Sequence, residues 1–197
     1  MWTKEEAPVK WEIQQAQTSF AKGFLAGKKG CVLALPADVP EKYFEMFGAF
    51  ATWFHFAEFE DKPTYNRLFH KVRPRIGKDV MIHWAEFFHL PGAIIPPNKV
   101  LIIDFDSCGL YHRSFYFAFR EIFKSHKLAQ RSIIRWTFAQ RGQMANDILD
   151  GVANIMRCAG DHGYKVAEQL PARSYAEVRH GRKGTPMLTG QFHLERI

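Results

Sequence analysis

Short runs of apolar residues alternate along this chain with longer segments in which apolar residues recur at helical spacing. Such runs are typical of strands buried on both faces of a parallel sheet, with the intervening helices covering those faces. The alternation therefore predicts an α/β fold of three layers, with the sheet in the middle. The predicted strands are 31–35, 53–59, 80–84, 100–106 and 132–138, followed by 175–179 and 187–194.

The segments between these strands show the 3.6-residue period of amphipathic helices. In the first helix, apolar residues predict the face that is buried (Trp11, Ile13, Ala16, Phe20 and Phe24). The last two strands are joined by a short connection containing Gly181 and Gly184, which predicts an antiparallel hairpin. The predicted helices are 4–25, 41–50, 63–72, 113–126 and 145–158. Residues expected to be buried in central parallel strands are Leu33, Ile102, Ile103, Ile133 and Ile134.

The composition indicates one soluble globular domain, because 47% of the 197 residues are hydrophobic and 24% are charged. We divide the chain into an N-terminal helix, 1–26, and a main domain, 27–197. No run of about 18 apolar residues is present, which argues against a membrane-spanning helix. Three widely spaced cysteines favour neither a disulfide framework nor a metal site, and they indicate a cytoplasmic protein. The histidines show no ligand spacing, so no metal is expected.

The net charge of +7 favours an anionic partner, with nucleic acid the first candidate. Part of this charge is concentrated late in the sequence, where an aromatic residue, Tyr175, lies among the cations. That pattern suits contacts to a phosphate backbone, although a solvated basic surface would have the same composition. The cations of this part of the chain are Arg131, Arg135, Arg141, Arg173, Arg179, Arg182 and Lys183.

Acidic residues stand at the ends of three predicted strands. Asp104 and Asp106 end the most apolar strand, and residues two apart on a strand point to the same face. Burying carboxylates is costly unless they have partners, so this pair indicates a site. Glu58 ends the second strand and Glu86 follows the third. In doubly wound sheets, ligands bind at the carboxyl ends of the strands, where these acids are expected to lie.

The order of strands and helices, together with these acids, resembles the class I, Rossmann-like methyltransferases that use S-adenosylmethionine. The resemblance covers nearly all of the chain after Gly27 and implies a seven-stranded, mostly parallel sheet with a C-terminal antiparallel hairpin. It places Leu35, Pro36 and Ala37 where the family has a glycine-rich cofactor loop, although the usual Gly-x-Gly pattern is absent here. It also implies that the cofactor is bound by Glu58 at the ribose, by Glu86 at the adenine, and by Asp104. Glu60 and Asp61 are alternatives to Glu58.

The segment Asp104-Phe105-Asp106-Ser107-Cys108-Gly109 is similar to the fourth motif of the amino methyltransferases in this family. It resembles the Asp-Leu-Asp-Pro-Phe-Gly of transfer-RNA guanine N2-methyltransferases, with Ser107 and Cys108 in place of the proline-bearing pair. The resemblance implies catalytic positions for Asp106, Ser107 and Tyr111, with Asp106 orienting an amine toward the methyl group. It also brings a group of late residues near the opening of the site, where they would contact nucleic acid (Arg173, Tyr175, Arg179, Arg182 and Lys183).

Two functions follow as expectations. The first is a methyltransferase that uses S-adenosylmethionine and acts on an amine of a nucleic-acid base. The second is a non-catalytic nucleic-acid-binding or interaction protein that keeps this fold, which the missing glycine pattern favours. The sequence leaves open the acceptor atom and the oligomeric state.

Overall fold

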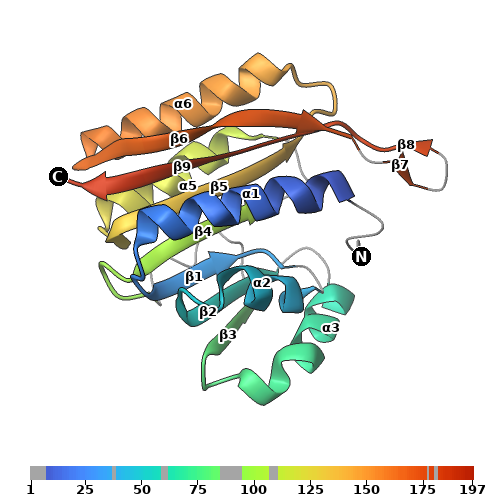
Figure 1. Cartoon of the computed structure of the whole chain (residues 1–197), viewed down its shortest axis with the longest axis vertical. Helices are drawn as coiled ribbons and strands as arrows, with labels where there is room; N and C mark the ends of the chain where they lie inside the picture. The colour runs from blue at the N-terminus through green and yellow to red at the C-terminus, as the bar shows by residue number, and fades with distance from the viewer. Residues whose placement is uncertain are drawn as a thin grey trace.

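The structure is a computed structural model that describes residues 8–36, 39–58, 62–84, 95–106, 111–176, 178–179 and 182–197. A seven-stranded sheet in the order β3-β2-β1-β4-β5-β9-β6 forms the middle layer, as predicted (Figure 1). The pairs β3–β2, β2–β1, β1–β4 and β4–β5 are parallel, whereas β9 is antiparallel to both of its neighbours. The strands are β1 Gly30–Ala34, β2 Ala51–Glu58, β3 Val80–Trp84, β4 Val100–Asp106, β5 Leu128–Ala139, β6 Tyr164–Tyr175 and β9 Met187–Arg196.

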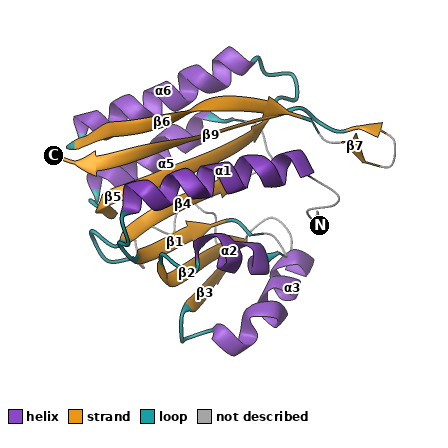
Figure 2. Ribbon diagram, viewed as in Figure 1, coloured by secondary structure: helices purple, strands orange, loops and turns teal. Residues whose placement is uncertain are grey.

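Helices cover both faces of the sheet (Figure 2). On one face α1, α2 and α3 pack over a core that includes Val32, Phe54 and Ile102. On the other face α5 and α6 pack over a core that includes Leu33, Phe105 and Ile103. The helices are α1 Pro8–Leu25, α2 Pro40–Phe47, α3 Lys62–Val72, α5 Arg113–Lys124 and α6 Ala145–Asp161, and a short 3-10 helix, η1, spans Arg73–Arg75. None of these helices is long and apolar enough to cross a membrane.

The five aliphatic residues predicted to lie in central strands are each at most 1% exposed, which confirms that part of the prediction. The predicted strand at 175–179 is wrong, since the strand paired with β9 is β6, Tyr164–Tyr175. β6 lies at the edge of the sheet, so most of its residues are exposed and it lacks the apolar alternation that marks a half-buried strand. Pro171 and two irregularities in its register with β9 weaken the signal further.

Between β6 and β9, Val178–Arg179 and Arg182–Lys183 form a separate ladder of two short strands, β7 and β8. β6 runs parallel to β5, because both are antiparallel to β9. It therefore ends at the edge of the sheet where β1 to β5 end. The β7–β8 ladder projects beyond the sheet at that edge, on the right in Figure 1.

The buried face of α1 differs from the face predicted by its apolar residues. Ala16 is exposed, whereas Gln14 and Gln17 are only 3% and 4% exposed. These glutamines meet polar side chains of the sheet: Gln17 Nε2 lies 3.5 Å from Thr189 Oγ1, and Gln191 Nε2 donates to the Gln17 carbonyl. The helix is thus buried on a mixed polar and apolar face, which an analysis of apolar spacing alone does not detect.

Candidate active site

Five parallel strands, β1 to β5, end at one edge of the sheet, which we call the carboxyl edge, and the candidate site lies at the ends of β1 to β4. The described residues at these ends are Leu35 and Pro36 after β1, Glu58 in β2, Trp84 in β3 and Asp106 in β4. Ala37, Glu86 and Ser107, together with the alternatives Glu60 and Asp61, lie outside the described residues. The first turn of α1 also lies at this edge, because α1 runs antiparallel to β4.

Asp106 is the central charged group of this edge. Its Oδ2 lies 2.7 Å from the Lys10 ammonium, and the Gln14 amide nitrogen lies 3.5 Å from the same oxygen. Burial raises the pKa of Asp106, but the positive charges of Lys10, Lys42 and Arg135 outweigh it and bring the pKa to about 2. Asp106 is therefore an ionised acceptor at neutral pH, fixed in place by α1.

Lys42, in the first turn of α2, belongs to the same group of charges. Burial lowers its pKa to about 7, with further lowering by Lys10 and Arg135 and an opposing effect of Asp106. Its ammonium therefore gains and loses a proton in the physiological range. Lys10 and Lys42 carried no sequence signal of their own, although Lys10 shares the helical spacing of Ile13, Gln14 and Gln17 on the buried face.

Asp104 lies in a buried ion pair with Arg135. The Arg135 Nε donates to Asp104 Oδ1 at 2.8 Å, and its Nη2 contacts the second oxygen, so the guanidinium binds both carboxylate oxygens. The two residues are paired across β4 and β5, and their side chains are at most 2% exposed. The guanidinium also lies 4.9 Å from the centre of the Phe47 ring. Arg135 is thus part of the interior rather than of a basic surface.

The turn after β1 is held by α2. The Tyr43 hydroxyl donates to the Leu35 carbonyl at 3.2 Å, and the Val39 backbone N–H donates to the Pro36 carbonyl at 3.0 Å. Pro36 is buried and Leu35 is partly buried. A proline and a tyrosine hydrogen bond therefore fix the chain here, at the place where the family that the sequence resembles has glycines.

Glu58 and Trp84 are neighbours at the ends of β2 and β3, where they are register partners. Glu58 is partly exposed, and Trp84 is 44% exposed, high for the largest apolar side chain. The Trp84 ring meets Tyr65 of α3 edge-to-face at 5.2 Å. The pair places a carboxylate beside an exposed aromatic side chain. Trp84 was not among the candidate residues predicted from the sequence. Its position at the end of a predicted strand was a signal that it could belong to the site.

Tyr111 is held on the opposite side of the sheet from Asp106. Its backbone N–H donates to Gln143 Oε1 at 3.0 Å, and Gln143 Nε2 donates back to the Tyr111 carbonyl at 2.8 Å. Its ring packs edge-to-face on Phe138, and a Cβ at Gly151 of α6 would lie 2.3 Å from that ring. Asp106 contacts α1 instead. The structure therefore does not bring these two candidate residues together.

The late basic group is described only in part. Arg173 is exposed on β6, whereas Tyr175 is 7% exposed and so has little ring surface for stacking. Arg179, Arg182 and Lys183 belong to the β7–β8 ladder. Their backbone projects from the carboxyl edge, beyond the end of β6 (Figure 1).

Two histidines form a close pair between β2 and β3. His55 Nδ1 lies 3.2 Å from His83 Nε2, and the rings are stacked with centroids 5.4 Å apart. Burial, together with the neighbouring His83, lowers the pKa of His55 to about 4. Burial also lowers the pKa of His83. No group of three or more metal-binding side chains occurs among the described residues.

We expect this pair to make the stability of the fold depend on pH. The unfolded chain protonates His55 near its ordinary pKa of 6.5, whereas the folded chain does so near pH 4, so the unfolded state binds more protons between these values. The free energy of unfolding should therefore decrease as the pH falls through this window, by about 2 kcal/mol after solvent screening. Urea unfolding at neutral pH and at pH 4 measures the decrease. We expect the decrease in the free energy of unfolding to be about 2 kcal/mol smaller in His55→Phe than in the unmodified protein.

His70→Gln, a change of an exposed histidine on α3, is the matched control and should retain the full decrease. The same pH dependence in His55→Phe and in the unmodified chain would show that the histidine pair is not its source.

Comparison with solved structures identifies the class of fold: it is that of the class I, Rossmann-like methyltransferases. Over its whole length the chain matches 78% of the M. jannaschii protein TYW2 in complex with AdoMet, with a TM-score of 0.57 and 12% identity. It matches the P. horikoshii TYW2 in complex with MeSAdo with a TM-score of 0.59 and 12% identity, over 100% of this chain and 65% of that one.

An rRNA methylase from Streptococcus thermophilus matches over 92% of this chain and 95% of its own, with a TM-score of 0.54 and 9% identity. No protein-family model matches the sequence, and no curated protein does. The similarity is therefore one of fold, and it carries no residue-by-residue information on activity.

Proposed function

We propose that this protein transfers a methyl group from S-adenosylmethionine to an amine of a nucleic-acid base. The observation that carries the proposal is the buried, ionised Asp106 at the end of β4, in a sheet that has Glu58 at the end of β2. Solved structures of the same fold include proteins in complex with AdoMet and MeSAdo and an rRNA methylase.

The residues at the carboxyl edge fit the cofactor chemically. Glu58 is a carboxylate that can accept hydrogen bonds from both ribose hydroxyls. Trp84 beside it is an exposed aromatic side chain, which is the kind of group that packs on an adenine ring. When bound, S-adenosylmethionine supplies a methyl group on a positively charged sulfur. The fixed turn at Leu35 and Pro36 lies at the neighbouring strand end and would limit how the cofactor enters.

Asp106 would act on the acceptor. An ionised carboxylate accepts an N–H of the target amine, and this hydrogen bond directs the nitrogen lone pair toward the methyl group. Lys10 and Gln14 hold the Asp106 carboxylate through Oδ2 and so fix its orientation at the end of β4. The contribution to rate would come from this positioning, since the methyl donor is already reactive.

Nucleic acid as the acceptor is supported by charge. The chain has a net charge of +7 and the β7–β8 ladder, which includes Arg179, Arg182 and Lys183, extends from the carboxyl edge. A base presented to Asp106 would bring its phosphates to this edge, where cations bind them.

A second function, nucleic-acid binding without catalysis, is favoured by one feature of the site. Lys10 neutralises Asp106 at 2.7 Å, which weakens it as an acceptor for an amine. Calorimetric titration with S-adenosylmethionine and S-adenosylhomocysteine separates the two functions. Binding of both supports the methyltransferase. A folded protein that binds neither ligand contradicts the methyltransferase function and supports nucleic-acid binding without catalysis.

Within that titration, Glu58→Gln should lower cofactor affinity about ten- to a hundred-fold. A hydrogen bond to a charged acceptor contributes about 1.5–3 kcal/mol, and the neutral amide loses this charge. Glu121→Gln, which changes an exposed glutamate on α5, should leave the affinity unchanged. Equal affinities in the unmodified protein and Glu58→Gln would remove Glu58 from the site and point to Glu60 or Asp61.

A further inference from the structure

The edge of the sheet opposite the carboxyl edge, where β1, β4 and β5 begin, carries a concentration of positive charge. We call it the amino edge. The connections that lead into these three strands each supply lysines, and β6 and β9 add further cations where they reach the same edge. The exposed or partly exposed cations of this edge are Lys28, Lys29, Lys99, Lys124, Arg131, Lys165 and Arg196.

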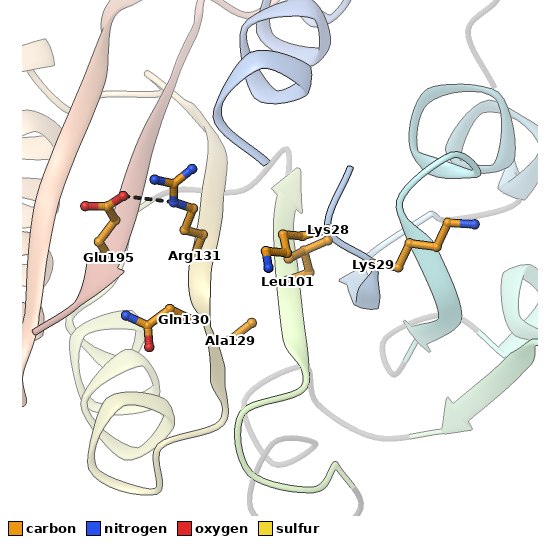
Figure 3. Close-up of a pocket in the computed structure, with 7 residues that line it drawn as sticks. All are labelled: Lys28, Lys29, Leu101, Ala129, Gln130, Arg131 and Glu195. Atoms are coloured by element: carbon orange, nitrogen blue, oxygen red, sulfur yellow. Dashed lines mark ion pairs between the residues drawn. The ribbon is translucent and has the colours of Figure 1, made fainter. Parts of the chain in front are cut away.

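A pocket of about 540 Å³ lies at the centre of the amino edge (Figure 3). Leu101 and Ala129 give it apolar surface, and Lys28, Gln130 and Arg131 stand around it. Figure 3 shows the Lys28 side chain pointing toward the Arg131 side of the pocket, whereas Lys29 points away from it, along the edge toward β2. The volume is in the range of ligand-binding pockets.

The acid that lines this pocket is already neutralised. Glu195 accepts from Arg131 Nε at 2.9 Å and lies 3.1 Å from the Lys165 ammonium. These contacts, the one to Lys165 first, lower the pKa of Glu195. Among the described residues, none forms an ion pair with Lys28 or Lys29. Lys28 therefore adds a positive charge beside the pocket that no described carboxylate pairs with.

The cations are presented on a fixed backbone. Gly27 has a φ of +76°, which allows the tight turn between α1 and Lys28-Lys29. At Gly30 a Cβ would lie 2.8 Å from the Lys99 carbonyl oxygen, so glycine is needed to hold the start of β1 against this segment. The Lys99 N–H donates to the Lys127 carbonyl, and Arg196 donates to Asn98 Oδ1 at 2.6 Å. Little backbone entropy is then lost when an anion binds, and the remaining cost is the ordering of the lysine side chains.

We propose that the amino edge is a second nucleic-acid-binding surface, with phosphates on Lys28, Lys29 and Lys99 and the pocket at its centre. The proposal rests on nucleic acid being the substrate, but it does not depend on the cofactor. β4 has seven residues, so the two edges are about 20 Å apart. An RNA that reaches Asp106 and the amino edge together must pass around the domain, which selects for a folded or extended substrate over a single nucleotide.

The test measures binding of a fluorescent single-stranded RNA of about 20 nucleotides, which is longer than the distance between the two edges even at the duplex rise of about 3.4 Å per nucleotide. Lys28→Glu/Lys29→Glu should lower affinity at least about 30-fold at low salt, and should reduce the slope of log affinity against log salt by about 1.4, since each lost phosphate contact removes about 0.7 for a single strand. Lys28→Gln/Lys29→Gln should show the same reduction in slope with a smaller loss.

Arg120→Glu/Arg157→Glu is the matched control, because it changes the net charge equally through exposed residues of α5 and α6. It should bind RNA within about twofold of the unmodified protein, and all variants should keep their melting temperature and cofactor affinity. Equal losses of RNA affinity in the Lys28/Lys29 and control variants would show an effect of net charge alone and would contradict the proposed binding surface.

Two further outcomes separate this proposal from others. If the unmodified protein binds no RNA at low salt, both the proposed surface and the proposed substrate are wrong. If it binds RNA and the changes at Lys28 and Lys29 leave the affinity unchanged, only the proposed surface is wrong. Polyglutamate of matched charge is added as a competitor. If it displaces RNA as well as unlabelled RNA does, the amino edge binds acidic chains in general, and the assignment to nucleic acid is wrong.

Discussion

Replacing Arg135 with methionine is expected to lower the free energy of unfolding by about 3–5 kcal/mol. Arg135 binds both oxygens of Asp104, and both side chains are at most 2% exposed. The substitution leaves a charged Asp104 in the interior without this partner, and that cost, rather than the lost attraction, dominates. Urea unfolding followed by circular dichroism measures the change. The urea midpoint should fall while the slope of the transition stays constant.

The double variant Asp104→Leu/Arg135→Met is the control for this prediction. It removes both charges and keeps apolar volume between β4 and β5, so it should recover most of the lost stability. If the free energy of unfolding of Arg135→Met lies within about 1 kcal/mol of that of the unmodified protein, the ion pair does not hold Asp104 in place. Asp104 then stays a candidate for binding the cofactor.

Changing Asp106 to asparagine should lower the rate of methyl transfer about 100-fold or more. The asparagine keeps the shape of the side chain but loses the negative charge that orients the amine, and small errors in position cost rates of this size. Cofactor affinity should stay within about threefold, since Asp106 acts on the acceptor side. Single-turnover transfer of a labelled methyl group to RNA measures the rate, and calorimetry measures the affinity.

Asp150→Asn, on the exposed face of α6, should leave both quantities unchanged. Melting curves test whether the variant is folded, because Lys10 loses its charged partner in Asp106→Asn. A rate equal to that of the unmodified protein would exclude Asp106 from the reaction. A fall in cofactor affinity equal to that of Glu58→Gln would instead place it on the cofactor side.

The central strands could be predicted from the sequence because their burial on both faces leaves a continuous apolar signal, as in Val32-Leu33-Ala34 and Leu101-Ile102-Ile103. The edge strand β6 could not, because it is exposed and pairs through its backbone. The same limit applies to α1, where Lys10, Gln14 and Gln17 are buried against polar groups that belong to distant parts of the chain.

The candidate site was predictable in part for a related reason. Asp104 and Asp106 on one strand indicate a buried charged group, but their partners Arg135 and Lys10 are fixed by packing between separate elements. Local spacing therefore located the two acids as one site, and the family resemblance alone gave them different roles, cofactor binding for Asp104 and catalysis for Asp106. The structure separates them, with Asp104 between two strands and Asp106 under the first turn of α1.

The two outermost strands of the sheet, β3 and β6, affect how the protein self-associates at high concentration. Exposed strand edges recruit strands of other molecules, which leads to aggregation. β6 interrupts its outer edge with Pro171, two register irregularities and the charged Lys165 and Glu168, and β3 at the other edge has five residues. Among the residues that the structure describes, neither of these two strands offers a long, regular template for a further strand, so self-association by pairing with β3 or β6 is disfavoured.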